Sequence, residues 1–269
     1  MRPVRLAVLG DPLSFTRSPE LHRAGLSALG LEGESLALRT PVDSLAARLA
    51  ELEAAGYAGV NLTYPLKEAA LALVARSSPS SLAARSVNTI GFAGDGRWGD
   101  TTDGAGFVDF LHTLAREPAS ESVVIFGSGG ASRSLALALL ESGAHVTIVS
   151  RDPAAARDGW SAISGAMLIA AEGNELDGAL RQATLVVNGT PTASGTEPVA
   201  PARIPSSAAV VDLTYGSAPT GWVSAARAAG LEASDGLGLL VHQARRSLSL
   251  WFGRDVPLEP LARAVGWAP

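Results

Sequence analysis

Short apolar runs alternate with segments of helical periodicity along nearly the whole chain. The runs have the length and composition of buried strands, and they predict strands near residues 6–9, 35–39, 58–62, 86–92, 123–126, 145–149, 167–170, 185–188 and 209–213. Leucines and alanines at three- and four-residue spacing predict helices between several of these strands. This alternation is typical of parallel sheets covered by helices, so we expect an α/β fold.

Capping residues place the first two helices. Ser18 stands before Pro19 and Asp43 before a leucine-periodic segment, and both have side chains that favour the N-cap position. Gly30 and Gly56 are placed to end these helices. A further helix is expected over residues 67–75.

The length of 269 residues favours two domains over one. The β-α rhythm restarts at residue 123, with a buried strand, a glycine loop and a helix. We therefore predict an N-terminal α/β substrate domain over residues 1–103, completed by C-terminal helices within 238–269. Residues 104–237 are predicted to form a Rossmann-like, doubly wound dinucleotide-binding domain.

Composition excludes several classes of protein. The chain is 47% hydrophobic and 17% charged, which suits ordinary folded cores, and its net charge of −5 lacks the basic footprint that nucleic-acid binding needs. No apolar stretch reaches the length of a membrane span. The absence of cysteine excludes disulfides and thiolate metal sites, and four scattered histidines suggest no metal site. We expect a cytoplasmic protein without a membrane or nucleic-acid partner.

A glycine-rich loop follows the strand predicted at residues 123–126. The loop residues are Gly127, Ser128, Gly129, Gly130 and Ala131. Small residues between a buried strand and a helix let backbone N–H groups and the helix N-terminus approach a pyrophosphate. Ser132 replaces the third glycine of the strict motif, but the β-α-β context favours a dinucleotide.

The end of the next strand gives conflicting signals about the cofactor. In Ser150-Arg151-Asp152, the arginine suits the 2′-phosphate of NADP, whereas an acid at this position suits the ribose of NAD. Asp152 precedes Pro153, which favours a helix-capping role for the aspartate. NADP is favoured and NAD stays possible.

Four polar clusters follow predicted strands in the first half of the chain. They occupy residues 10–12 with 16–19, 61–67, 87–89 and 101–104, where open α/β sheets place ligands. Together with the glycine loop and the segments 188–190, 212–215 and 235–243, they resemble the shikimate dehydrogenase family in order and spacing over nearly the whole chain. The resemblance implies reversible, NADP-linked reduction of 3-dehydroshikimate to shikimate in aromatic amino-acid biosynthesis.

The resemblance also implies roles for individual residues. It makes Lys67 and Asp103 the catalytic pair, in which a lysine can pass a proton to the forming alkoxide. It implies substrate contacts to the carboxylate and ring hydroxyls from Thr16, Ser18, Asn61, Thr63, Asn88, Tyr215 and Gln243. It adds cofactor contacts, beyond the glycine loop, from Ser150, Arg151, Thr190, Leu213 and Gly236.

Departures from the family pattern keep alternatives open. Thr101 stands where the family usually has asparagine, Thr16 where it usually has serine, and Asp152 where it usually has threonine. A quinate or quinate/shikimate dehydrogenase that uses NAD is therefore a second hypothesis. A non-catalytic nucleotide sensor is a third, although Lys67 and Asp103 argue against it. We expect a monomer or a homodimer, because the sequence does not specify the oligomeric state, and we assign no role to His22 or His242.

Overall fold

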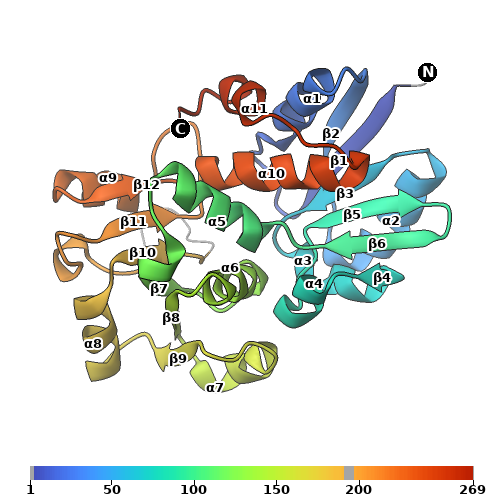
Figure 1. Ribbon diagram of the computed structural model, residues 1–269. Helices are drawn as coiled ribbons and strands as arrows, with labels where there is room; N and C mark the ends of the chain where they lie inside the picture. The colour runs from blue at the N-terminus through green and yellow to red at the C-terminus, as the bar shows by residue number, and fades with distance from the viewer. Residues whose placement is uncertain (1–2, 191–196, 269) are drawn as a thin grey trace. The chain divides into compact units, whose positions relative to one another are not determined.

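The computed structural model describes residues 3–190 and 197–268 of the chain (Figure 1). The chain forms two compact units. The first contains Met1–Gly106 and Leu240–Pro269, and the second contains Phe107–Leu239.

The first unit is built on a six-stranded mixed sheet with the order β2-β1-β3-β5-β6-β4. Its strands are β1 (Val4–Gly10), β2 (Gly33–Arg39), β3 (Gly59–Leu62), β4 (Arg76–Ser77), β5 (Thr89–Ala93) and β6 (Gly96–Asp100). Strands β1, β2 and β3 are parallel, whereas β5 runs antiparallel to both β3 and β6. The carboxyl end of β3 therefore lies beside the amino end of β5, where Asn61 pairs with Thr89.

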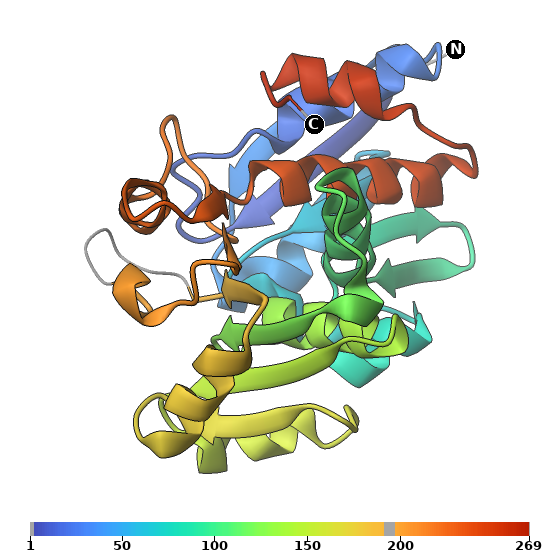
Figure 2. The same cartoon turned by 60° about the vertical axis from the view of Figure 1, so that its left-hand side comes forward.

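Helices cover both faces of this sheet. They are α1 (Ser18–Ala28), α2 (Leu45–Ala54), α3 (Leu66–Ala69), α4 (Pro79–Ala84), α11 (Leu258–Ala264) and most of α10 (Leu237–Phe252). Leucines of α2 share one apolar core with Val60 and its neighbours. The adjacent Gly59 faces the other way, against Trp251 of α10. Gly25 of α1 contacts Leu248 of α10, so both helices cover that second face, and α11 lies beside α1 (Figures 1 and 2).

The second unit contains a six-stranded sheet with the order β12-β11-β10-β7-β8-β9. Its strands are β7 (Ser122–Phe126), β8 (His145–Ser150), β9 (Met167–Ala170), β10 (Leu185–Asn188), β11 (Ala209–Asp212) and β12 (Glu232–Ser234). All five pairings are parallel. Numbered within the unit, the order is 3-2-1-4-5-6, which confirms the predicted doubly wound Rossmann arrangement. The strand order reverses between β7 and β10, where such folds place a dinucleotide.

The helices of the second unit are α5 (Asp103–Thr113, most of its length), α6 (Gly130–Glu141), α7 (Pro153–Ala156), α8 (Asn174–Gln182) and α9 (Gly221–Ala228). The apolar core joins Val124 and Phe126 of β7 to Leu176 and Leu180 of α8. Trp222 of α9 belongs to the same core, and its indole N–H donates to the Val199 carbonyl at 2.8 Å. The buried strands are rich in valine and isoleucine, as parallel strands covered on both faces require.

Three local predictions were wrong. Ser18 is the first residue of α1, Arg17 takes the N-cap position without a side-chain capping bond, and the Ser18 N–H donates to the Thr16 hydroxyl oxygen at 3.2 Å. Asp43 does not cap α2, since a 3₁₀ turn over Val42–Ser44 precedes that helix. The helix expected over residues 67–75 is one α-helical turn, α3, followed by a 3₁₀ turn over Ala70–Leu73.

Within the residues that the structure describes, no helix combines the length and the hydropathy needed to span a bilayer. The longest described helix, α10, has 16 residues.

Candidate functional site

The carboxyl end of β3 and the turn after it carry three of the predicted site residues. Asn61 lies in β3, Thr63 follows it, and Lys67 lies in α3. Thr63 packs directly on the end of β1, where a Cβ added at Gly10 would lie 2.4 Å from the Thr63 methyl carbon. Glycine at position 10 thus lets β1 end against this turn. Asn61, Thr63 and Lys67 are all half-buried.

Lys67 and Asp103 form an ion pair with 2.6 Å between Nζ and Oδ2. The Asp103 side chain is 4% exposed and the Lys67 side chain is 18% exposed, so the carboxylate is enclosed while the lysine side chain is partly exposed. Asp103 is also the first residue of α5, where a negative charge is favourable. The predicted catalytic pair is therefore in contact, with the lysine on its accessible side.

Asn88 holds the second oxygen of that carboxylate. Its Nδ2 lies 2.8 Å from Asp103 Oδ1 and 3.0 Å from Gln243 Oε1. Its Oδ1 accepts from the backbone N–H of Thr102 at 2.8 Å and from the Thr89 hydroxyl at 2.9 Å. Asn88 is 1% exposed, so its amide orients Asp103 and Gln243 from within the protein.

Asn61 belongs to the same hydrogen-bonded network. Its Nδ2 faces the Asn88 carbonyl oxygen at 2.9 Å, and the hydroxyls of Thr89 and Ser247 at 3.0 and 2.9 Å. Its Oδ1 lies 2.8 Å from Nε2 of the buried His22. The pKa of His22 falls from 6.5 to about 4, chiefly because burial disfavours the charged ring; the hydrogen bond with Asn61 acts in the opposite direction, and the charge of Arg23 makes a smaller contribution to the lowering. The imidazole is neutral at neutral pH.

Thr16 and Ser18 stand together at the start of α1. The Thr16 hydroxyl donates to Ser18 Oγ at 3.2 Å. Ser18 Oγ accepts no capping hydrogen bond from the helix backbone, and its hydroxyl can donate a proton as well as accept. The two hydroxyls and the helix N-terminus can together hold a carboxylate.

The glycine loop of the second unit joins β7 to α6. Gly127 has a φ of +107°, and a Cβ added there would lie 3.0 Å from atoms of Gly189 and Thr190, so a side chain here would be strained and crowded. Gly129 is exposed at the N-cap of α6 and faces open space. Ser132, at the third position of the motif, is buried and packs against Gly189. This close packing requires a small side chain at position 132. The loop therefore has the open backbone and helix N-terminus that a pyrophosphate requires.

Two side-chain donors hold the backbone of the glycine loop at Ser128. Arg133 Nη1 and Trp160 Nε1 both donate to the Ser128 carbonyl, at 3.0 and 3.2 Å. The Ser128 hydroxyl lies 3.3 Å from that of Ser150, at the end of β8. Two predicted cofactor residues from separate loops are thus in contact.

The side chains of Arg151 and Asp152 differ in their interactions. Asp152 caps α7, where its Oδ1 accepts from the Ala155 N–H at 2.9 Å, as predicted. Arg151 is exposed, and no side chain in the described ranges forms an ion pair with it. The capping bond directs the carboxylate to the helix and leaves the guanidinium for an anion, which fits the 2′-phosphate of NADP.

Asp212 organises the ends of β10 and β11. It accepts from Asn188 Nδ2, the Thr214 N–H and the Thr220 hydroxyl at 2.8–3.0 Å, and Asn188 in turn accepts from the Thr190 hydroxyl at 2.6 Å. This cluster supports Thr190 and the loop that contains Leu213 and Tyr215.

Leu213 and Gly236, both predicted to contact the cofactor, lie against each other. A Cβ at Gly236 would lie only 2.1 Å from the Leu213 carbonyl oxygen, so this approach requires glycine. Tyr215 is half-buried in the loop after β11.

Several residues of the first unit's network could not be found from the sequence. They are His22, Ser35, Thr89, Gly106 and Ser247. Ser247 is fully buried in α10 and joins Asn61, Thr89 and Thr102. Gly106 allows α5 to pass within 2.9 Å, measured from a hypothetical Cβ, of the Gln243 backbone nitrogen. The sequence did offer two signals: Thr89 lies in the polar cluster of residues 87–89, and His22 lies within a segment that matches the family pattern.

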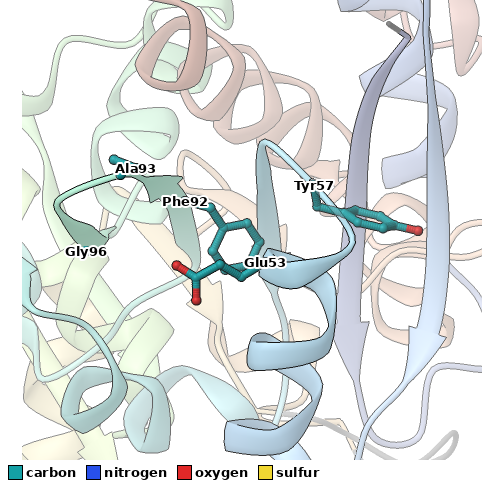
Figure 3. A pocket seen from close by; sticks show the side chains of 6 residues that line it. Glu53, Tyr57, Phe92, Ala93 and Gly96 are labelled. Atoms are coloured by element: carbon teal, nitrogen blue, oxygen red, sulfur yellow. The ribbon is translucent and has the colours of Figure 1, made fainter.

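A surface pocket of about 460 Å³ lies elsewhere on the first unit (Figure 3). Tyr57, which precedes β3, and Ala93, which ends β5, both line it. The pocket therefore lies at the amino end of β3, whereas Asn61 lies near its carboxyl end. Its one carboxylate, Glu53, is paired with Arg97 at 2.8 Å. The pocket is therefore separate from the network around Lys67. The described residues contain no group of three histidine, aspartate or glutamate side chains that could hold a metal ion.

Comparison with known proteins identifies relatives over nearly the whole length of the chain. Family models described as the shikimate dehydrogenase substrate binding domain, a putative NAD(P)-binding domain and the shikimate 5′-dehydrogenase C-terminal domain match residues 8–90, 114–203 and 236–265. A shikimate dehydrogenase (NADP(+)) of Acidiphilium cryptum strain JF-5 is 40% identical, over 97% of this chain and 95% of that protein.

Solved structures agree with this match. Shikimate 5-dehydrogenase from Thermus thermophilus, in complex with NADP(H) and shikimate, superposes with a TM-score of 0.85 at 34% identity and covers 98% of both chains. The 5-ketofructose reductase of Gluconobacter sp. strain CHM43 superposes with a TM-score of 0.81 at 25% identity, over 98% of both chains. The fold is thus shared by reductases of different polyhydroxylated substrates, and the side chains of the site must decide between them.

Proposed function

Because this chain belongs to the shikimate dehydrogenase family, we propose that it catalyses the reversible, NADP-linked reduction of 3-dehydroshikimate to shikimate. The observation that carries the proposal is the Lys67–Asp103 pair, 2.6 Å apart, which Asn88 holds in a network of polar side chains. A nucleotide sensor without chemistry has no need of a partly exposed lysine paired with an enclosed carboxylate. This pair therefore favours an enzyme over a nucleotide sensor.

The two units divide the work in this proposal. The first unit, centred on residues 1–103 and the C-terminal helices, binds the substrate and carries the acid/base group. The second unit holds NADP through the Gly127–Ala131 loop, the N-terminus of α6, Ser150 and Arg151, with Thr190, Leu213 and Gly236 near the nicotinamide end. When bound, NADPH supplies the hydride that reduces the carbonyl carbon.

Lys67 handles the proton in the first unit. Its ammonium group donates to the carbonyl oxygen as that oxygen becomes an alkoxide, and it takes the proton back in the oxidative direction. Asp103 holds the ammonium group at 2.6 Å and balances its charge. Because Asn88 fixes the other carboxylate oxygen, the pair needs little reorganisation during the reaction.

Polar side chains around the pair select the substrate. Thr16 and Ser18 bind the carboxylate, with Tyr215 as a third hydroxyl, and Asn61, Thr63 and Gln243 bind the ring hydroxyls. Asn88, also predicted to contact the ring, is enclosed and acts instead through Asp103 and Gln243. Amide and hydroxyl groups suit a polyhydroxylated ring because they donate and accept hydrogen bonds. A substrate that lacked one of these hydroxyls would leave a polar group of the site unpaired.

Assays with shikimate and quinate, each with NADP and NAD, test the proposal directly. We expect the highest kcat/KM for shikimate with NADP, because the capped Asp152 leaves Arg151 for the 2′-phosphate. In the same assay, Lys67→Ala should lower kcat by about 10²–10⁴-fold with a small change in the KM for NADP. Higher turnover of quinate with NAD would overturn the assignment, and activity within a factor of two in Lys67→Ala would overturn the mechanism. Cytoplasmic location and a monomeric or dimeric state stay predictions from the sequence.

A further inference from the structure

His22 is fully buried, yet it contacts a residue of the proposed substrate site. Nε2 lies 2.8 Å from Asn61 Oδ1, and Nδ1 lies 2.8 Å from the hydroxyl of Ser35 on β2. The Trp251 ring meets the imidazole edge to face, with 5.4 Å between the centroids. Both ring nitrogens thus have partners, and packing fixes the plane of the ring.

The surroundings of Asn61 permit only one orientation of its amide. The Asn88 carbonyl oxygen, 2.9 Å from Nδ2, can only accept, so the NH₂ group of Asn61 must face it. Oδ1 then faces His22, and Nε2 must carry the imidazole proton. Nδ1 is left to accept from the Ser35 hydroxyl, which completes a consistent set of donors and acceptors.

This arrangement leaves Asn61 with one unused hydrogen-bond acceptor position. The two N–H groups are shared among the Asn88 carbonyl and the Thr89 and Ser247 hydroxyls. His22 occupies one of the two lone pairs of Oδ1, and the other has no partner among the described residues. Asn61 is half-buried, in contrast to the enclosed Asn88, so this lone pair belongs to the more accessible of the two asparagines.

We propose that His22 is a positioning residue that fixes Asn61 as a hydrogen-bond acceptor for one non-reacting ring hydroxyl of the substrate. The proposal rests on the function proposed above. A neutral Nε2–H donor locks the amide from behind, so Asn61 accepts a hydroxyl proton but discriminates against a carbonyl oxygen at the same ring position. His22 thereby contributes to specificity without touching the substrate.

Two variants separate this role from packing. The amide nitrogen of Gln in His22→Gln can take the place of Nε2 and keep the donor to Asn61. The shorter side chain of His22→Asn can reach Ser35 but not Asn61. We expect His22→Asn to raise the KM for shikimate about five- to tenfold, with the KM for NADP unchanged, and His22→Gln to stay within about threefold of the parent. His145→Asn, at an exposed histidine, is the matched control and should change neither value.

A substrate analogue provides a readout that a purely structural role would not move. Two analogues of shikimate, each lacking one of the two ring hydroxyls that do not react, are compared with shikimate in the parent and in His22→Asn. For one analogue, the loss of kcat/KM relative to shikimate should be at least fivefold smaller in the variant. Equal effects of the Asn and Gln variants, or unchanged discrimination for both analogues, would overturn the proposal.

Nuclear magnetic resonance of the parent protein keeps the proposal testable if the variants fail to fold. The ¹⁵N shifts of His22 should show a neutral ring at pH 7 with its proton on Nε2 and slow exchange of that proton with water. A proton on Nδ1 would contradict the orientation derived for Asn61. This measurement does not depend on turnover, so its failure is distinct from a failure to oxidise shikimate.

Discussion

A buried imidazole makes the stability of this protein depend on pH at the scale of a single residue. His22 has a pKa of about 4 in the folded chain and an ordinary value of 6.5 when exposed. Desolvation by the surrounding core is the main cause, because the charged ring would lose its water there. Between these two values the unfolded chain binds a proton that the folded chain does not bind. Folding is therefore opposed as the pH falls.

We predict that the free energy of unfolding decreases as the pH is lowered from 6.5 towards 4, with a contribution of about 3 kcal/mol from His22. Below about pH 4 this loss of stability is complete, because His22 is then protonated in both the folded and the unfolded chain. Urea unfolding at a series of pH values measures it. His22→Gln should remove this part of the slope between pH 6.5 and 4, and an unchanged slope would show that other groups cause it.

At the scale of secondary-structure elements, glycines at the candidate site allow chain segments to approach one another closely. Gly10 admits Thr63 at the end of β1, Gly106 admits the Gln243 backbone, and Gly236 admits the Leu213 carbonyl after β11. In each case an added methyl group would meet atoms closer than a van der Waals contact allows. The positions of these loops thus depend on the absence of a side chain.

We expect Gly236→Ala to destabilise the protein by about 1–3 kcal/mol and to raise the KM for NADP, since the new methyl group must push the Leu213 backbone away. Gly221→Ala, in the first turn of α9 with no atom within 4 Å of the added carbon, is the control and should change stability by less than about 0.5 kcal/mol. Denaturant midpoints and cofactor kinetics measure both. Equal effects of the two substitutions would refute the close-approach argument.

At the scale of the whole molecule, binding of the cofactor is linked to folding. A ligand that binds only the folded chain stabilises it according to its concentration relative to Kd. The sheet order of the second unit, the open Gly129 and the exposed Arg151 all suit a dinucleotide that carries a 2′-phosphate. Such a ligand should therefore raise the unfolding free energy of the chain.

NADP at one hundred times its Kd should add about 2.7 kcal/mol to the free energy of unfolding. In Arg151→Ala, which loses the contact to the 2′-phosphate, affinity for NADP should fall at least tenfold, and the same NADP concentration should add about 1.4 kcal/mol less. The stabilisation by NAD should be unchanged. Thermal unfolding with each cofactor checks this, and an equal loss for NADP and NAD would assign Arg151 to another part of the dinucleotide.

Much of the architecture follows from patterns within short stretches of sequence. Valine- and isoleucine-rich runs at residues 123–126 and 185–188 are buried strands because apolar side chains on both faces leave no other placement. The glycine loop after Phe126 and the capping role of Asp152 also depend on near neighbours, and both appear as predicted. The family pattern was readable because its motifs keep their order and spacing along the chain.

The sequence by itself determined the fold class, the doubly wound sheet, the dinucleotide loop and the family, because each depends on local periodicity or on a linear order of motifs. Only the tertiary structure decided how the polar groups pair. Ser247 reaches Asn61 across 186 positions of sequence, and His22 reaches it across 39, because helices packed on one sheet face bring them there. Ser18 also differs from its prediction, because α1 begins at Ser18 itself and its hydroxyl oxygen accepts from Thr16 and caps no helix N–H. Hydrogen bonds depend on positions within a few tenths of an ångström, which a linear pattern does not specify.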